Sequence, residues 1–150
     1  MKSKRLISLL LTCIMAISMV SMPVFAESEI KVLLDGQALE FDVPPQLIGD
    51  RTMVPMRKIF EAMGAVVYWD GETRTIIAVK NDVVMLMQID NPVIHVNGES
   101  ITLDVPPQLV DSRTLVPARV VAESLKAKVD WDGEARTVLI VTEAPAESLE

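Results

Sequence analysis

The stretch that decides the fold is Asp42-Val-Pro-Pro-Gln-Leu47, followed closely by Arg51-Thr-Met-Val-Pro-Met-Arg57. The chain contains this stretch twice. The second copy reads Asp104-Val-Pro-Pro-Gln-Leu109 and then Arg113-Thr-Leu-Val-Pro-Ala-Arg119. A motif of this length that returns at a fixed offset indicates that the chain is built from two copies of one unit.

The repeat extends well beyond the quoted motif. Residues 31–80 align with residues 93–142 without a gap, and 22 of the 50 aligned positions are identical. Residues 81–92 join the two copies. A unit of about 50 residues buries too little surface to be stable alone. We therefore expect residues 27–142 to form one domain in which the two repeats share a core.

Each repeat is predicted to run strand, strand, helix, strand, strand. Asp35-Gly36 and its counterpart Asn97-Gly98 are typical of tight hairpin turns. Pro44-Pro45 interrupts the strand pattern, because proline donates no hydrogen bond to a sheet. Pro55 suits the first position of a helix. The predicted class is α+β, with a mostly antiparallel sheet.

The predicted helix has one apolar face. Its apolar side chains recur at the helical spacing i, i+3, i+4, i+7, at Met56, Ile59, Phe60 and Met63 in the first copy and at Ala118, Val121, Ala122 and Leu125 in the second. Gly64 is expected to cap the first helix at its C-terminus. Lys126 stands at the same place in the second copy, so that cap is expected to be weaker or to be made differently.

A strand follows each helix, and a comparison of the copies separates its two faces. Ala65, Val67 and Trp69 alternate, and the second copy has Ala, Val and Trp131 at the same places, so this face is expected to be buried in the core. Sugar stacking by the two tryptophans is the alternative. Val66 and Tyr68 are Lys and Asp in the second copy, so they are expected either to pack against the other repeat or to form a surface for a partner.

The N-terminus is predicted to be a secretory signal peptide. Residues 1–26 combine a basic start, an uncharged apolar run and a small-residue cleavage pattern that ends at Ala26. The apolar run is shorter than a membrane-spanning helix requires, although an uncleaved anchor is the alternative. The mature protein is therefore expected outside the cell or in the cell envelope. Residues 143–150 are expected to be a frayed polar tail.

Removal of the leader changes the charge and the cysteine content. The mature chain carries 11 basic and 21 acidic residues, a net charge of −10, and no Cys. This charge disfavours binding to nucleic acid or to anionic lipid. A disulfide framework is excluded despite the export signal.

The motifs together resemble those of the copper amine oxidase N-terminal-like domain, also called a stalk domain, of secreted bacterial proteins. The resemblance rests on the two Pro-Pro motifs, the two Arg-Thr-(Met/Leu)-Val-Pro motifs, and the segments Trp69-Asp-Gly-Glu72 and Trp131-Asp-Gly-Glu134. In the oxidases this domain is an appendage outside the catalytic core. The resemblance therefore implies a fold and export, but no catalytic residue.

Copper chemistry is not expected in this chain. The copper centre of those oxidases needs three imidazoles and a modified tyrosine, whereas this chain has one His, His95, and one Tyr, Tyr68. One imidazole does not make a type-2 copper site. His95 replaces a leucine of the first copy, so it is expected to be packed rather than to act as a ligand. No metal, cofactor or catalytic residue is predicted.

The remaining repeated polar residues are interpreted as structural. The carboxylates beside each Trp-Asp-Gly segment suit turns better than catalysis or calcium binding. Arg57 and Glu61, with their counterparts Arg119 and Glu123, are spaced as ion pairs on the surface of a helix. Asp42 and Arg51 flank the Pro-Pro loop, as Asp104 and Arg113 do in the second copy, and each pair is expected to bridge its own loop.

The predicted function is that of an exported, non-catalytic structural or binding module. The alternative is a module that binds carbohydrate or a cell-wall polymer, and another envelope protein is a further candidate partner. A small hydrolase is disfavoured because the sequence offers no set of nucleophile and base. A pull-down on purified cell wall with and without Trp69→Ala discriminates between the first two functions, because retention that depends on Trp69 would favour the carbohydrate-binding module.

Overall fold

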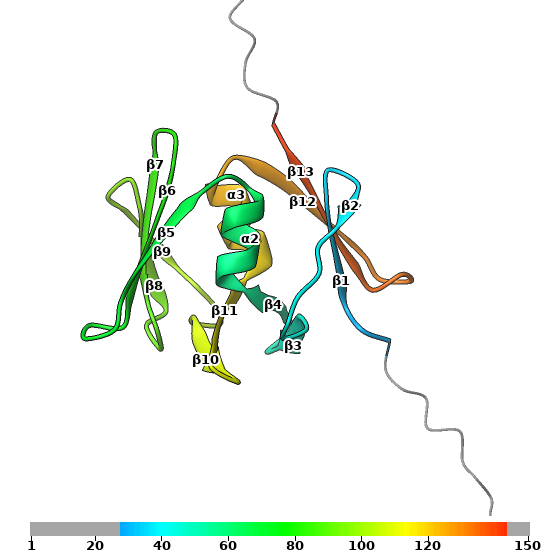
Figure 1. The fold of residues 1–150 in the computed structure, drawn as a ribbon, viewed down its shortest axis with the longest axis horizontal. Helices are drawn as coiled ribbons and strands as arrows, with labels where there is room; N and C mark the ends of the chain where they lie inside the picture. The colour runs from blue at the N-terminus through cyan, green and yellow to red at the C-terminus, as the bar shows by residue number, and fades with distance from the viewer. Residues whose placement is uncertain (1–27, 144–150) are drawn as a thin grey trace, which may run out of the picture.

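The computed structural model describes residues 28–143, which form three β-sheets around two short helices (Figure 1). The predicted signal peptide and nearly all of the predicted tail lie outside the described residues. The strands are β1 (Lys31–Leu34), β2 (Gln37–Ala38), β3 (Gln46–Ile48), β4 (Arg51–Pro55), β5 (Val66–Asp70), β6 (Thr75–Lys80), β7 (Val83–Gln88), β8 (Val93–Val96), β9 (Glu99–Thr102), β10 (Gln108–Val110), β11 (Arg113–Pro117), β12 (Ala127–Asp132) and β13 (Thr137–Thr142). The helices are α2 (Met56–Ala62) and α3 (Ala118–Ser124).

The predicted α+β class is wrong, because the protein is mostly β. Strands take up 51% of the described residues and helices only 12%. Each helix has seven residues, and each stops where the next residues turn back into a strand. The segment after Pro44-Pro45, predicted to be a loop, contributes a further hairpin, β3–β4, and its counterpart β10–β11. The two prolines lie just outside this hairpin, so they do not interrupt its hydrogen bonds.

The two outer sheets each combine strands of both repeats. Sheet A has the order β12-β13-β1-β2, and sheet C has the order β5-β6-β7-β8-β9. In sheet A, β1 and β13 pair in parallel from opposite ends of the described chain, with Val32 opposite Val138. In sheet C, the joining segment supplies β7, which pairs antiparallel with both β6 and β8. The repeats are therefore interlocked, and each completes a sheet of the other.

The central sheet B relates the repeats by an approximate twofold axis. Its order is β10-β11-β4-β3, with β4 and β11 antiparallel at the middle. Val54 lies opposite Val116, and Met53 lies opposite Pro117. Because Val116 is the counterpart of Val54 in the second copy, the axis passes between these two valines.

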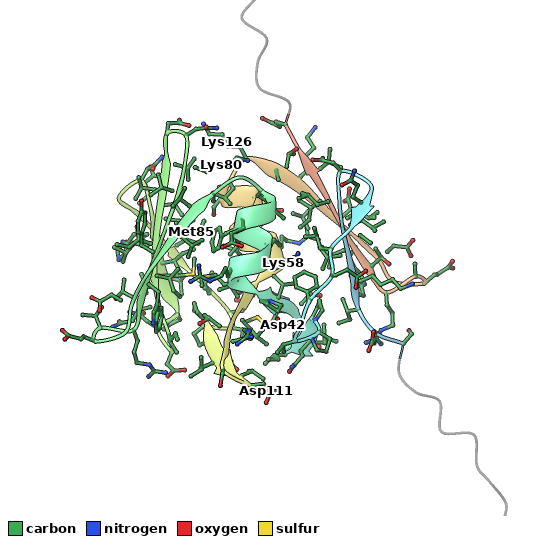
Figure 2. All side chains as sticks on the ribbon, in the orientation of Figure 1. Asp42, Lys58, Lys80, Met85, Asp111 and Lys126 are labelled. Atoms are coloured by element: carbon green, nitrogen blue, oxygen red, sulfur yellow. The ribbon has the colours of Figure 1, made fainter. Side chains whose placement is uncertain are left out.

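The helices lie between the two outer sheets and bury the face that was predicted. The eight residues predicted to line the two helix faces are all buried, and Ile59 and Phe60 are fully buried. The apolar cluster around them includes residues from both repeats and from the joining strand. Figure 2 labels one of these, Met85 of β7, in the layer between sheet C and helix α2.

Both helices end in the same left-handed conformation, although only one ends in glycine. Gly64 has φ +81°, and Lys126, its counterpart, has φ +62°. The Lys126 N–H donates to the Glu123 carbonyl at 3.0 Å, and its ammonium lies 2.9 Å from Asp82. The second cap therefore keeps the geometry of the first and adds an ion pair to the turn before β7.

Candidate functional site

Two hollows of similar size lie beside the N-termini of the two helices. We call them the Trp131 groove, of about 680 Å³, and the Trp69 groove, of about 670 Å³. Such volumes are within the usual range of ligand-binding clefts. The Trp131 groove is lined mainly by Leu47, Arg51, Asp104, Pro117, Arg119 and Trp131. The Trp69 groove is lined mainly by Leu109, Arg113, Asp42, Pro55, Arg57 and Trp69.

The six residues named for each groove correspond through the repeat. Every residue in the first of these lists has its counterpart, 62 positions away, in the second. Each groove also takes side chains from both copies: Leu47 and Arg51 come from the first repeat, whereas Trp131 comes from the second. A single repeat therefore supplies only part of each groove.

The tryptophans are partly exposed in these grooves, so the prediction that they belong to the core is wrong. Trp69 is 44% exposed and Trp131 is 43% exposed. The predicted strand face is nevertheless the inward one near the helix, where Ala65 is only 5% exposed. The tryptophans lie at the far ends of β5 and β12, beside the hairpin turns, where the strands extend past the apolar layer.

Each indole lies over the glycine of its own turn. The Trp69 Nε1 lies 3.5 Å from the position that a Cβ on Gly71 would take, and for Trp131 and Gly133 the distance is 3.4 Å. A Cβ at either glycine would be in ordinary van der Waals contact with the ring. The Trp-Asp-Gly segment thus seats one edge of the ring and leaves nearly half of its surface accessible.

The aspartates of these segments hold the turns, as predicted. Asp70 Oδ1 accepts the Glu72 N–H at 2.9 Å, and Oδ2 accepts the Thr73 hydroxyl at 2.9 Å. These hydrogen bonds, that of the Thr73 hydroxyl first, hold the pKa of Asp70 below its ordinary value. Asp132 accepts the corresponding N–H groups of Glu134 and Ala135, each at 3.0 Å. These carboxylates are engaged by their own turns.

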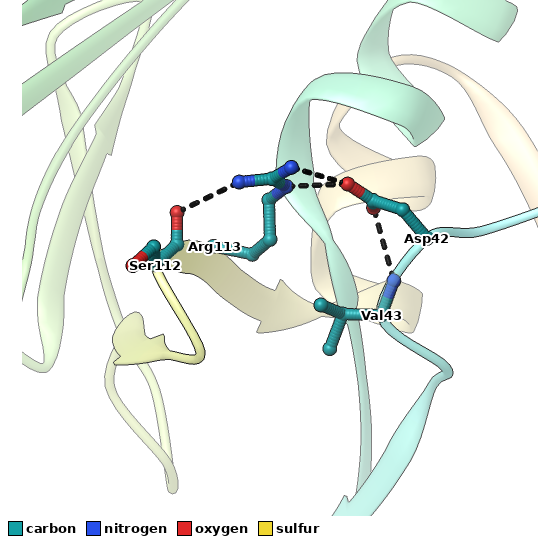
Figure 3. Close-up of polar contacts among 4 residues, drawn as sticks. All are labelled: Asp42, Val43, Ser112 and Arg113. Atoms are coloured by element: carbon teal, nitrogen blue, oxygen red, sulfur yellow. Dashed lines mark hydrogen bonds and ion pairs between the residues drawn. The ribbon is translucent and has the colours of Figure 1, made fainter.

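The repeated Asp–Arg pairs connect the two repeats and do not bridge their own loops as predicted. Arg113 donates through Nε to Asp42 at 2.6 Å (Figure 3), and Arg51 pairs with Asp104. The antiparallel pairing of β4 with β11 places the first residue of each strand beside the Pro-Pro loop of the other repeat. The hydrogen bond from Arg113 holds the pKa of the Asp42 carboxyl below its ordinary value.

A second arginine flanks each groove at the start of a helix. Arg57 pairs with Glu61 and Arg119 with Glu123, each at 3.5 Å, as the helical spacing predicted. Arg119 also donates to the Val129 carbonyl of β12 at 3.1 Å, which ties helix α3 to sheet A.

The exposed leucines of the grooves were not identified from the sequence. Leu47 is 54% exposed and Leu109 is 56% exposed, on the hairpins of sheet B. The signal was present, because a leucine stands at this place in both copies. Identity in the copies alone does not separate a core leucine from an exposed one.

The family model of the copper amine oxidase N-terminal domain matches residues 33–140. The chain belongs to this family. The match covers both repeats, and it confirms the resemblance inferred from the motifs.

One curated relative of this family member is a Brevibacillus choshinensis protein named "Protease inhibitor". It is 29% identical over 115 residues, which cover 74% of this chain and 34% of the relative. The chain thus spans about a third of that protein's length. The family's N-terminal domain is a non-catalytic one.

The outer face of sheet C is the other surface singled out by the sequence of this family member. Val66 is 56% exposed and Tyr68 is 60% exposed, so neither packs against the second repeat. Val84 and Leu86 of β7 are also exposed and lie two strands away on the same sheet. On sheet A the counterparts of the first two residues are Lys128 and Asp130, and exposed Val141 lies opposite Lys128, so that face is mixed whereas the face of sheet C is more apolar.

His95 lies on the exposed side of β8, so the prediction that it is packed is wrong. Its Nδ1 lies 3.1 Å from the Ser100 hydroxyl on β9. Within residues 28–143, no three His, Cys, Asp or Glu side chains are grouped so that they could hold a metal ion. No helix in the same range is long and apolar enough to cross a membrane.

Proposed function

We propose that this protein is an exported, non-catalytic module that binds an uncharged glycan of the cell envelope in its two grooves. The observation that carries the proposal is the partly exposed tryptophan in each groove. An indole face is the side chain best suited to cover the apolar face of a sugar ring, and it keeps its N–H for a polar partner.

The polar side chains of the grooves suit hydroxyl groups. Arg51 and Asp104 line one groove, and their counterparts Arg113 and Asp42 line the other. Guanidinium groups only donate hydrogen bonds and carboxylates only accept them, whereas a sugar hydroxyl does both. A pair of this kind therefore offers complementary partners to adjacent hydroxyls.

The charge of the grooves favours an uncharged ligand. The Trp131 groove contains three acidic and two basic side chains, and the Trp69 groove contains three of each. The net charge of the whole chain is −7. Near-balanced grooves on an acidic protein provide no field that would attract a polyanion. The neutral glycan strand of a wall polymer fits better than its anionic decorations.

The test is retention on purified peptidoglycan, together with isothermal titration against the N-acetylglucosamine hexamer, an uncharged oligosaccharide. We expect the wild type to be retained, and the double variant Trp69→Ala/Trp131→Ala to lose retention and hexamer affinity by about tenfold or more, as the stacking contacts are removed. Tyr68→Ala is the matched control, because Tyr68 is an exposed aromatic residue of β5 that lines neither groove. Equal retention of all three proteins would refute the proposal.

A second candidate function follows from the named relative, which matches this chain over 115 residues. Under this alternative the chain inhibits a protease. The measurement is the residual activity of subtilisin and of trypsin, each mixed with an equimolar amount of this protein. Inhibition that survives in the double tryptophan variant would favour this alternative over glycan binding.

A further inference from the structure

We infer that each chain binds two glycan segments at the same time, one in each groove, and thereby cross-links the polymer. This inference rests on the glycan-binding function proposed above. It adds a second binding site per chain and the cross-linking of glycan strands, neither of which glycan binding alone requires.

The first support is the symmetry of the central sheet. Val54 lies opposite its own counterpart Val116, and the residues on either side of them exchange places in the same way. An approximate twofold axis therefore passes through the middle of sheet B. The two outer sheets lie on opposite sides of it (Figure 1). The Trp131 groove beside sheet A and the Trp69 groove beside sheet C are related by this axis.

The second support is that the chemistry of the groove is kept in both copies. The exposed leucine, the cross-repeat Asp–Arg pair, the helix arginine, the proline and the tryptophan are present in both grooves. The exposed fractions also match: 44% and 43% for the tryptophans, and 54% and 56% for the leucines. Side chains as exposed as the leucines are not retained by core packing, so duplication of the core alone does not explain them.

The third support is that the two grooves are separate. No residue lines both of them. Each is bounded by its own outer sheet, by β12 or by β5. A ligand in one groove therefore leaves every contact of the other available.

The grooves differ at several lining positions, and one helix position predicts unequal affinities. Val120 lines the Trp131 groove, whereas its counterpart Lys58 lines the Trp69 groove. Figure 2 labels Lys58 on helix α2, with Asp42 of the same groove below it. The additional ammonium offers a further hydrogen-bond donor, so a ligand rich in carbonyl oxygens is expected to prefer the Trp69 groove.

The experiment counts sites on the full chain by isothermal titration with the N-acetylglucosamine hexamer. We expect a stoichiometry of two for the wild type and for the control Tyr68→Ala. We expect one for Trp69→Ala and one for Trp131→Ala. Leu47→Ser and Leu109→Ser test the same grooves without touching the tryptophans. These leucines are more than half exposed, so the variants are expected to fold even if a tryptophan variant does not.

Cross-linking is measured by the turbidity and pelleting of soluble glycan fragments mixed with the protein. The wild type should pellet them. Each single-groove variant, meaning one with a single substitution at Trp69, Trp131, Leu47 or Leu109, should not pellet them. Its apparent affinity for the polymer should fall by about a hundredfold, because avidity requires two sites. The same variant should still bind one hexamer.

The outcomes separate this inference from the function on which it rests. A wild-type stoichiometry of one would overturn the bivalency and leave glycan binding intact, and so would a single-groove variant that loses both sites. Pelleting that persists in every single-groove variant would also overturn it. If neither the hexamer nor peptidoglycan binds the wild type, the proposed function itself is wrong.

Discussion

The two helix caps allow the free-energy cost of a positive φ to be compared, because the same left-handed conformation is adopted by glycine in one copy and by lysine in the other. Gly64 and Lys126 both have positive φ. An L-residue in the left-handed region costs roughly 1–2 kcal/mol, which glycine avoids. Glycine in turn lowers the folding stability by about 0.4–1 kcal/mol, because it gives the unfolded chain more conformational freedom. Lys126→Gly is therefore expected to stabilise the backbone by about 0.5–1 kcal/mol.

The ion pair between Lys126 and Asp82 opposes this gain and must be removed from the comparison. The two side chains are 59% and 72% exposed, so their attraction is strongly screened by solvent. The comparison is therefore made in the background Asp82→Asn. In that background, Lys126→Gly should raise the Tm by about 3 °C for a domain of this size.

The reciprocal change at the other cap is the matched control. A Cβ on Gly64 would meet no atom within 4 Å, so Gly64→Ala adds strain without a clash. It should lower the Tm by about the amount that Lys126→Gly raises it. The Tm values come from thermal unfolding followed by circular dichroism, and urea titration supplies the free energies of unfolding. If Lys126→Gly lowers the Tm in the Asp82→Asn background, the reasoning that positive φ dominates at these caps is refuted.

Two further predictions concern the exposed sheet face and the pair between repeats. The double variant Val66→Lys/Tyr68→Asp, which installs the residues found at these places in the second copy, should change the free energy of unfolding by less than about 0.5 kcal/mol; a large loss in urea titration would mean that this face is buried in a contact that the structure does not contain. The lowered pKa of Asp42 means that its pair with Arg113 contributes stability above the unfolded-state pKa of about 4, and that this contribution is lost as the pH falls through the lower folded-state pKa. Asp42→Asn should therefore reduce the fall in Tm between pH 5 and pH 2, roughly the range in which a carboxyl of lowered pKa titrates. A Tm that falls as steeply below pH 5 in the variant as in the wild type would contradict this.

The helices and turns were predictable because local sequence decides them. The apolar spacing from Met56 to Met63 fixes which side of the helix is buried. Asp35 and Asn97 adopt the positive φ that a tight turn before glycine requires. Such features depend on neighbours a few residues away, so no knowledge of the rest of the chain is needed.

The central sheet was not predictable from the same rules. Gln46–Ile48 is only three residues long and follows two prolines, which favours a loop when the segment is taken alone. It is a strand because Arg51–Pro55 folds back onto it and is itself fixed by pairing with the other repeat. The exposure of Trp69 was missed for a related reason: alternation identifies which face of a strand points inward, but not how far the core extends along that strand.

The Asp–Arg pairs show a general ambiguity of duplicated chains. Each arginine can pair with either of two equivalent aspartates, one in its own repeat and one in the other, so composition and spacing favour neither partner. Only the antiparallel pairing of β4 with β11 decides between them, and it selects the partner in the other repeat for both Arg51 and Arg113. The same pairing brings Leu47 of one repeat into one groove with Trp131 of the other. The interlocking that makes the pairs unpredictable therefore also builds the candidate grooves, and neither repeat alone could supply a complete one.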